Sequence, residues 1–333
     1  MLQRNIRFGI VGCGLIARFH ADAIASLENA ALMGVADASR PLAERFAESR
    51  GVKAYPDFDA MLADPRIEAV CICTPSGLHG ENALQALKAG KHVVLEKPMA
   101  FTAAQAKELE AQAQKSGCVL TVISQLRFSE DIRSVKALLE QNAFGKLVLC
   151  DLYMKYWRDP AYYAESPWKG TLRFDGGGAL MNQGIHGVDI LLYLAGNAKV
   201  LCAKNRTLFH SIEVEDCSVA MLEFENGAMG VMEATTCACP GFERRLEIIG
   251  TEGSVVLVEN RIEKLIIGGE TVIDGVEELL TGTASDPAAM SCRLHAKQIA
   301  NFVGAINGEE ALAIPPAEGV RAVSLIEKIY SYT

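Results

Sequence analysis

The stretch IRFGIVGCGLIARFH, residues 6–20, decides the fold of the amino-terminal part of this chain. It opens with a short apolar run and closes with a helical pattern, and a glycine-rich turn, Gly12-Cys13-Gly14-Leu15-Ile16-Ala17, joins the two. A strand, a G-x-G-x-x-A turn and a helix in this order are typical of a unit that binds a dinucleotide. In such a turn Gly12 permits the bend, Gly14 lets a pyrophosphate approach the main chain, and Ala17 allows close helix packing.

The same alternation continues along the chain to about Ile123. Four further apolar runs are separated by helix-period segments, and they are ALMGVAD, AVCICT, HVVLE and CVLTVI. Buried parallel strands appear in a sequence as continuous apolar runs, and each needs a crossover helix. Residues 1–124 are therefore predicted to form an α/β domain with a doubly wound parallel sheet of the Rossmann type.

The sequence pattern changes after residue 124. A helical segment and a strand-like segment lead through a polar, aromatic loop to a helix predicted over residues 179–194. Residues 199–273 then contain short strand-like segments separated by turn signals such as ENG and TEG, which is typical of an antiparallel sheet. Helical patterns over 288–307 and 316–330 close the chain. Residues 125–333 are predicted to form a second, α+β domain.

Composition restricts the function classes. Of 333 residues, 50% are hydrophobic and 22% are charged, and the net charge of −9 argues against binding to nucleic acid or to an anionic membrane surface. No apolar run approaches the roughly 20 residues needed to cross a bilayer. The first residues lack the pattern of a secretory signal, so a cytoplasmic location is expected.

Cysteine and histidine usage predicts no metal site. None of the ten cysteines forms a C-x-x-C pair, and the six histidines show no zinc-ligand spacing. The close pairs are Cys71/Cys73 and Cys237/Cys239, and residues two apart share one face of a strand. Buried, reduced thiols are the expectation.

The end of the second apolar run suggests which cofactor is bound. Asp37 follows Ala17 by 20 residues, where a carboxylate would bond the ribose hydroxyls of NAD and repel the 2′-phosphate of NADP. Arg40, three residues later, could accept that phosphate. NAD is favoured over NADP.

Three further motifs resemble one family. They are Thr74-Pro75-Ser76-Gly77-Leu78-His79, then Glu96-Lys97-Pro98, and then Gly176-Gly177-Gly178 followed by His186. Their joint occurrence and order resemble the glucose–fructose oxidoreductase / inositol dehydrogenase / MocA family over essentially the whole chain. The resemblance implies a carboxy-terminal domain built on a large, open, mostly antiparallel sheet. It also implies association into a homodimer or homotetramer, and a sugar-like or polyol substrate.

Lys97 is the candidate general acid/base of such an enzyme. The pattern HVVLE puts Lys97 at the carboxyl end of a strand, the edge at which ligands bind open α/β sheets. An ordinary lysine, with a pKa of about 10.4, is a poor base at neutral pH. Burial and a nearby positively charged nicotinamide would both disfavour its ammonium form. We therefore expect Lys97 to exchange a proton with a substrate hydroxyl.

A second polar group is predicted on the helix over 179–194. Asn182, His186 and Asp189 are spaced to share one face of an α-helix. By the resemblance, His186 contacts the reacting hydroxyl and Asp189 supports it. Many members of the family have Asp where this chain has Asn182. An amide can bond a hydroxyl but cannot carry a proton, so any relay that needs a carboxylate there is unavailable. Versions with Asn are common among members that act on nucleotide-linked amino sugars and uronic acids.

The remaining candidates line the cofactor or the substrate. Those expected at the cofactor, by turn position or family position, are Gly12, Gly14, Leu15, Ile16, Asp37, Thr74, Pro75, His79, Glu96, Lys97 and Gln125. Those expected at the substrate are Lys97, Arg127, Arg158, Tyr163, Trp168, Asn182 and His186. His79 could instead pack against the following helix, and the aromatic residues of the loop 155–171 could simply pack that loop onto the sheet.

Two other functions stay open at this point. An NAD-dependent glycosidase or lyase would oxidise a sugar transiently and recycle the cofactor, using an additional base. A sensor would keep the cofactor site without catalysis, but it would have no chemical need of both Lys97 and His186.

Overall fold

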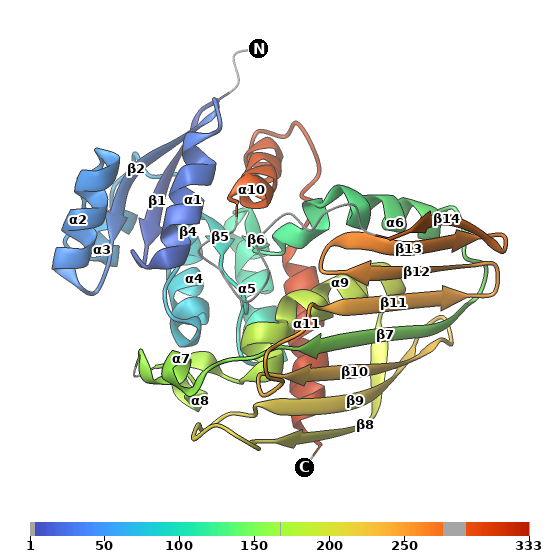
Figure 1. The fold of residues 1–333 in the computed structure, drawn as a ribbon. Helices are drawn as coiled ribbons and strands as arrows, with labels where there is room; N and C mark the ends of the chain where they lie inside the picture. Colours follow the sequence, from blue (N-terminus) through green and yellow to red (C-terminus); the bar gives the residue numbers. More distant parts are fainter. Residues whose placement is uncertain (1–3, 167, 276–290, 333) are drawn as a thin grey trace. The chain divides into compact units, whose positions relative to one another are not determined.

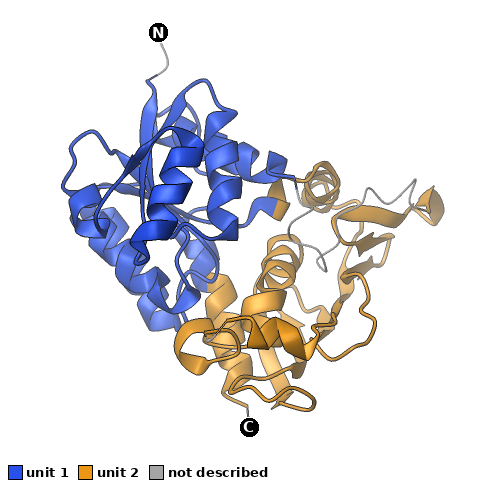
Figure 2. Ribbon diagram, turned by 60° about the vertical axis from the view of Figure 1, so that its left-hand side comes forward, with its two compact units in different colours: residues 1–125, 291–320 blue, residues 126–290, 321–333 orange. Residues whose placement is uncertain are grey.

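The computed structural model describes residues 4–166, 168–275 and 291–332 (Figure 1). The chain divides into two compact units (Figure 2). The first contains residues 1–125 and 291–320, and the second contains residues 126–290 and 321–333. The change of unit after Gln125 lies beside the boundary expected at 124/125, whereas the return of residues 291–320 to the first unit was not foreseen.

A six-stranded parallel sheet, in the order β3-β2-β1-β4-β5-β6, forms the first unit. Its strands are β1 (Ile6–Val11), β2 (Ala30–Ala36), β3 (Lys53–Ala54), β4 (Ala69–Ile72), β5 (His92–Leu95) and β6 (Leu120–Val122). The helices between them are α1 (Leu15–Ala25), α2 (Arg40–Arg50), α3 (Phe58–Leu62), α4 (His79–Lys88) and α5 (Ala103–Ser116), with a 3-10 turn η1 (Ser76–Leu78). Reversal of strand order on either side of β1 confirms the doubly wound prediction.

Helix α10 (Arg293–Ile306) completes the core of the first unit. Its buried face includes Ile299, Phe302 and Val303, which are spaced to lie on one side of a helix and join the core around β1. The Phe302 ring centroid is 6.1 Å from that of Phe8. Gln298 donates from Nε2 to the Val122 carbonyl and accepts the Ser124 N–H on Oε1, so the edge strand β6 gains side-chain hydrogen bonds. Residues 288–290 of the helix expected over 288–307 lie outside the described residues.

An eight-stranded sheet, in the order β14-β13-β12-β11-β7-β10-β9-β8, forms the second unit. Its strands are β7 (Leu147–Lys155), β8 (Ala198–Arg206), β9 (Cys217–Phe224), β10 (Met229–Thr235), β11 (Arg245–Gly250), β12 (Gly253–Val258), β13 (Arg261–Ile267) and β14 (Glu270–Asp274). Every neighbouring pair is antiparallel except β7 and β10. Both expected hairpins, β9–β10 and β11–β12, are present.

One face of this sheet is covered and the other is open. Buried and exposed residues alternate along β9, and helix α9 (Ile185–Ala195) packs on β7 and β11. The remaining helices are η2 (Gln125–Phe128), α6 (Glu130–Glu140), α7 (Pro160–Ala164), α8 (Leu172–Asp175), the π-helical turn η3 (Ala179–Gly184) and α11 (Pro316–Tyr330). Within the described residues, no helix combines the length and apolar composition that crossing a bilayer requires.

The packing of α10 predicts a large effect of Phe302→Ala. Phe302 is fully buried, and removal of a buried phenyl ring costs about 3–5 kcal/mol. We expect the melting temperature to fall by about 5 °C or more. Phe242→Ala is the matched control, because that ring is 61% exposed and its removal leaves no cavity. Equal melting temperatures for the two variants, measured by differential scanning fluorimetry, would contradict this account of α10.

Candidate functional site

The strands of the first unit end in one row. Val11 is paired with Ala36 and Ile72, Ile72 with Leu95, and Leu95 with Val122. The residues that follow these partners therefore emerge side by side at the carboxyl edge of the sheet, where open α/β sheets bind ligands. The cofactor candidates of this unit all lie in these segments.

The glycine-rich turn is fastened to the end of β2. Asp37 accepts the Cys13 N–H on Oδ2 and the Ser39 N–H on Oδ1, both at 2.7 Å. Gly12 has φ of +87°, and a Cβ there would lie 2.5 Å from the Cys73 carbonyl oxygen. Gly14 caps α1 without any side-chain hydrogen bond, so the N–H groups at Leu15 and Ile16 belong to an uncapped helix start. This start suits an anionic group such as a pyrophosphate.

The residues present fit a dinucleotide at this edge. A Cβ on Gly14 would meet nothing within 4 Å, which leaves open space in front of the α1 N-terminus. Gln125 is 4% exposed, and its Oε1 has no hydrogen-bond partner among the described residues. A buried acceptor without a donor is costly, and a bound hydroxyl or amide would satisfy it.

His79 links two loops of this edge. Its Nδ1 lies 2.8 Å from the Pro98 carbonyl oxygen and its Nε2 lies 2.9 Å from the Thr74 carbonyl oxygen. Burial lowers the pKa of His79, which favours a neutral ring that donates to one of the two carbonyls at a time. The ring thus ties the Thr74-Pro75 turn to the segment after Lys97.

Lys97 directly follows a buried carboxylate. Glu96, at the end of β5, is 5% exposed, and its Oε1 lies 2.7 Å from Nε2 of His20. Lys97 is half-buried, and the Lys97–Pro98 peptide bond is cis. The lysine that the sequence singled out therefore stands at the same strand edge as Asp37 and the glycine-rich turn.

In the second unit, the predicted helix begins as a π-helical turn, η3, and continues as α9. Asn182 donates from Nδ2 to Oδ1 of the buried Asp175, at 2.5 Å. Asp189 is buried and forms a bidentate pair with Arg127, at 2.6 and 2.8 Å. The expected shared face of Asn182, His186 and Asp189 is thus modified. The wider π-helical turn shifts Asn182 relative to α9, and Asn182 and Asp189 have different partners. His186 is half-buried on α9.

Arg127 differs most from its expected place. Its guanidinium group forms a bidentate ion pair with Asp189 in the interior of the second unit. Its Cζ atom lies over the Tyr193 ring, 4.6 Å from the ring centroid. A planar guanidinium is well suited to such a bidentate pair. This geometry gives Arg127 a role in holding α9, through Asp189, and its contact with substrate stays a prediction.

The aromatic loop packs mainly on neighbouring segments of the second unit. Arg158 donates to Oε1 of Gln183 at 2.7 Å and lies over the Tyr162 ring. The Tyr163 ring lies 4.7 Å from that of His210, and its hydroxyl is 3.2 Å from Oγ1 of Thr236. These contacts agree with the packing alternative for Tyr163. Trp168 remains half-buried.

Glu215, which the sequence did not single out, fixes the entry to η3. It accepts the N–H groups of Gly178 and Leu180, each at 2.8 Å, and the Tyr330 hydroxyl. A Cβ on Gly178 would lie 1.8 Å from the Glu215 carbonyl oxygen, so close main-chain approach explains this glycine. Burial raises the pKa of Glu215, although the three donors work against it. No pattern around Glu215 in the sequence marks it, since its partners are distant in the chain.

The ten cysteines are all free thiols, but the expectation that they are buried is wrong for most of them. Cys13, Cys71, Cys73 and Cys150 are buried, whereas Cys202 and Cys239 are exposed.

Two family models match the chain. The model described as "Oxidoreductase family, NAD-binding Rossmann fold" matches residues 6–124, and the model described as "GFO/IDH/MocA C-terminal domain" matches residues 132–256. The chain belongs to the GFO/IDH/MocA oxidoreductase family. The resemblance drawn from the three motifs is confirmed, and with it the NAD-binding, oxidoreductase character of the protein.

Similar proteins include several sugar and cyclitol dehydrogenases. The WlbA dehydrogenase from Bordetella pertussis, solved in complex with NADH and UDP-GlcNAcA, is 31% identical, with 98% of this chain and 96% of that chain covered and a TM-score of 0.87. Myo-inositol 2-dehydrogenase of Thermotoga maritima is 27% identical over 256 residues, 75% of this chain and 74% of that protein. Levoglucosan dehydrogenase of Pseudarthrobacter phenanthrenivorans is 28% identical over 301 residues, 79% of this chain and 76% of that protein.

The two glycines of the turn predict different outcomes for the same substitution. Gly14 has φ of −74°, which alanine adopts, and space for a Cβ, so Gly14→Ala should melt within about 2 °C of wild type. The added methyl group would occupy the space in front of the α1 N-terminus, and we expect NADH affinity to fall about tenfold or more. Gly12→Ala should lower both stability and NADH affinity, because its Cβ would collide with the main chain of Cys73. NADH fluorescence titration and melting curves separate the two effects. Wild-type NADH affinity in Gly14→Ala would refute the assignment of this turn to the pyrophosphate.

Proposed function

We propose that this protein transfers a hydride between nicotinamide and a secondary hydroxyl, or the matching ketone, of a sugar, cyclitol or sugar derivative, with Lys97 as general acid/base. The observation that carries the proposal is the location of Lys97 directly after β5, at the strand edge that also holds Asp37 and the glycine-rich turn. Relatives named as inositol and levoglucosan dehydrogenases support this substrate class.

The proton has to be handled by the side chains of this chain. When bound, NAD supplies the hydride acceptor, and the hydroxyl that loses a hydride must also lose a proton. The neutral Lys97 amine takes that proton in oxidation, and its ammonium form returns it in reduction. His186 orients the hydroxyl. Asn182 cannot carry a proton, and its amide, held by Asp175, bonds a neighbouring hydroxyl of the substrate.

NAD is the preferred cofactor in this proposal. Asp37 is anchored by two main-chain N–H groups, so its carboxylate is fixed at the end of β2. A carboxylate there favours ribose hydroxyls and repels a 2′-phosphate. Arg40, the competing candidate, forms an ion pair with Glu44 on the same helix, which supports the choice of NAD.

The substrate to test first is a nucleotide-linked uronic acid. The relative that is 31% identical over nearly the whole chain was solved with UDP-GlcNAcA. The family resemblance also associates an Asn at position 182 with members that act on such substrates. Among the cations near the aromatic loop, Lys169 is half-buried over the Tyr162 ring and paired with Glu165. An exchange of Glu165 for a substrate carboxylate or phosphate would suit this lysine.

Lys97→Met tests the proposed chemistry. The variant keeps the length of the side chain but removes the proton-carrying amine, so we expect turnover to fall by about 10²–10⁴. NADH affinity should stay within about threefold of wild type, because binding of the cofactor has many other contacts. Lys88→Met, at an exposed position of α4, is the matched control.

The assay is absorbance at 340 nm with NAD⁺ and NADP⁺ in parallel, on UDP-uronic acids, UDP-sugars, inositols, aldoses and glycosides. Near-normal turnover of Lys97→Met would refute its role. Aglycone release without net NADH would indicate transient oxidation instead, and a silent panel from protein that binds NADH would indicate a sensor.

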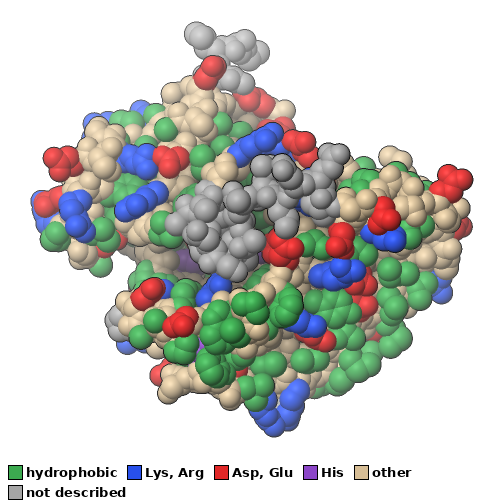
Figure 3. Space-filling view, in the orientation of Figure 1, with side chains coloured by type: hydrophobic (Ala, Val, Ile, Leu, Met, Phe, Trp, Pro, Cys, Tyr) green, Lys and Arg blue, Asp and Glu red, His purple; other side chains and the backbone are tan. Residues whose placement is uncertain are grey.

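The open face of the eight-stranded sheet supports self-association. Exposed apolar side chains of β7, β9 and β10 gather on it, and Figure 3 shows hydrophobic side chains over this part of the sheet. They include Leu149, Val219, Met221 and Met229, each 42–47% exposed. An exposed group of apolar side chains of this kind is typical of a protein interface. We propose that a second copy of the chain covers it, giving a homodimer or homotetramer.

Light scattering tests the association. We expect a mass of two or four chains for wild type and a smaller mass for Met221→Lys/Met229→Lys, because two charges would have to be buried in the interface. Val272→Lys, at a 58% exposed position of β14, should keep the wild-type mass. A monomeric wild-type protein at micromolar concentration would contradict the proposal.

A further inference from the structure

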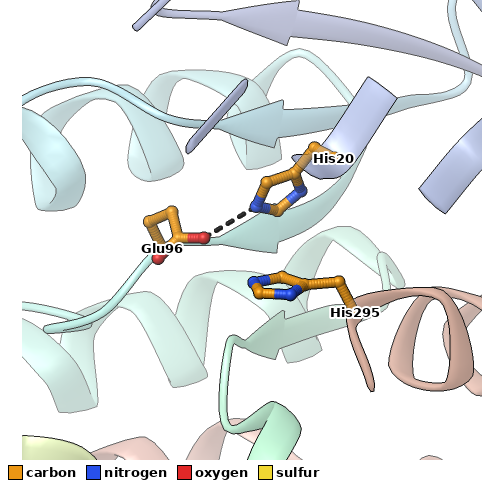
Figure 4. A group of neighbouring side chains, drawn as sticks. All are labelled: His20, Glu96 and His295. Carbon is orange, nitrogen blue, oxygen red and sulfur yellow. Dashed lines mark hydrogen bonds and ion pairs between the residues drawn. The ribbon is translucent and has the colours of Figure 1, made fainter. Parts of the chain in front are cut away.

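The first unit contains a buried group of three ionisable side chains, and one of them, Glu96, directly precedes Lys97 in the sequence (Figure 4). His20 comes from α1, Glu96 from the end of β5 and His295 from α10, and their exposed fractions are 0%, 5% and 2%. Their nitrogen and oxygen atoms lie within 4.8 Å of one another. Charges are rarely buried in this way without a partner, so the group needs an explanation.

Glu96 bridges His20 and the main chain of Lys97. Its Oε1 lies 2.7 Å from Nε2 of His20, and its Oε2 accepts the Lys97 N–H at 3.3 Å. Burial alone would raise the pKa of Glu96, but the hydrogen bond and the charge of His20 outweigh it and lower this pKa to about 2. The carboxylate is therefore ionised at any pH at which the enzyme works.

His20 is the cation of the group. Burial disfavours its charged form, but the neighbouring sulfur atoms of Cys73 and Cys71 favour it, and the net pKa of His20 is well above its ordinary value. Burial also raises the pKa of Cys73 to about 11, so that thiol is uncharged at neutral pH and Glu96 is the anion that His20 faces. The 2.7 Å contact with the ionised Glu96 carboxylate then favours the protonated form of His20, and in that form the two side chains are a buried ion pair.

His295 packs against His20 as an uncharged ring and adds no second positive charge to the group. Its ring meets that of His20 edge-on, with centroids 5.6 Å apart. Burial, and then the charge of His20, lower the pKa of His295 to about 4. Neither ring nitrogen has a hydrogen-bond partner among the described residues. This uncharged ring keeps the ion pair away from solvent, which strengthens the interaction between its members.

Two imidazoles and a carboxylate could also hold a metal ion, but the geometry favours the ion pair. Ligands about 2.0–2.1 Å from a tetrahedral zinc ion lie roughly 3.3 Å apart. The His20–Glu96 separation of 2.7 Å is that of a direct, charge-assisted hydrogen bond.

We propose that His20 is a positioning residue for Lys97: it holds the Glu96 carboxylate that receives the Lys97 N–H, and its positive charge balances that carboxylate next to the reactive amine. The inference rests on the proposed function, in which Lys97 exchanges a proton with substrate. An unbalanced carboxylate beside an amine stabilises the ammonium form, which cannot act as a base. His20 thereby keeps more of Lys97 in the neutral form at a given pH.

The charged and titratable groups that bear on this balance come from five elements. Cys71 of β4 and Cys73, directly after β4, face His20. Glu96 faces His20 of α1, His295 of α10 and Lys97 itself, and Lys97 also interacts with His79 of α4. Burial disfavours the protonated forms of His79 and His295. The buried imidazole that carries a positive charge next to Glu96 is therefore that of His20.

The test is the pH at which Lys97 becomes reactive in the full-length protein. Trace acetylation with acetic anhydride over a range of pH, followed by mass spectrometry of the Lys97 peptide, gives the midpoint without any substrate. His20→Gln keeps a hydrogen-bond donor but removes the charge, so we expect the midpoint to rise by about 0.5–1 pH unit. His20→Gln/Glu96→Gln removes both charges and should return the midpoint to within about 0.3 unit of wild type. His92→Gln, a histidine of the same unit outside the group, is the matched control.

These outcomes separate the inference from the proposed function. An unchanged midpoint in His20→Gln overturns the inference, and so does a shifted midpoint in the double variant. The double variant buries no unbalanced charge. If His20→Gln does not fold, the midpoint of Lys97 in the double variant therefore tests the inference. Stoichiometric zinc in the purified protein, lost in His295→Gln, would also overturn it. If Lys97→Met keeps its turnover, the proposed function fails whatever the midpoints are.

Discussion

In-register pairing of parallel strands is the constraint on which the rest of the first unit depends. Strands that run in the same direction and end at paired residues present their next residues in one row. In this chain the row contains a turn, two carboxylates, a lysine and a buried amide, each following an apolar strand of three to seven residues. None of these groups would meet if a strand slipped by one residue, because a slip turns every side chain to the opposite face. The apolar strands thus fix the register, and the register assembles the site.

Much of this arrangement could be predicted from sequence because each strand of a parallel sheet is buried on both faces. A continuous apolar run is a strong local signal, and the residue after it is placed at the sheet edge by topology alone. Asp37 was found in this way, and Lys97 was found from its position at the strand end together with the family motif Glu96-Lys97-Pro98. Periodicity also predicted α10, but it shows only that one face of a helix is buried, not which surface buries it. The packing of Phe302 on Phe8, and the hydrogen bonds of Gln298 to β6, depend on contacts between residues far apart in the chain.

The second unit shows a different limit. The sequence predicted a helix from residue 179, and spacing assigned three polar side chains to one face of it. The π-helical turn changed the spacing, and Glu215 explains how the turn is held: two of its first N–H groups are satisfied by one distant carboxylate. The glycine at 178 follows from the same contact, since the main chain of Glu215 leaves no space for a Cβ. A glycine-rich segment in a sequence indicates that a side chain would not fit there, but it does not show which atoms occupy the space.

Four buried carboxylates show why the His20–Glu96 pair matters for chemistry. Asp216 is satisfied by three main-chain N–H groups, and Glu215 by two and a tyrosine hydroxyl. Asp189 is satisfied by the permanently charged Arg127, so its charge balance is fixed at every working pH. Glu96 pairs with an imidazole, a partner that can lose its proton. Asp216 also faces an imidazole, that of His210, but Glu96 alone of the four is adjacent in sequence to the residue assigned to proton transfer. Neutral donors would have left the full negative charge beside Lys97, and they would have favoured its ammonium form. A cationic partner offsets the negative charge of Glu96 while still holding its carboxylate in place. The partner of Glu96 therefore affects the reactivity of Lys97 as well as the stability of the protein.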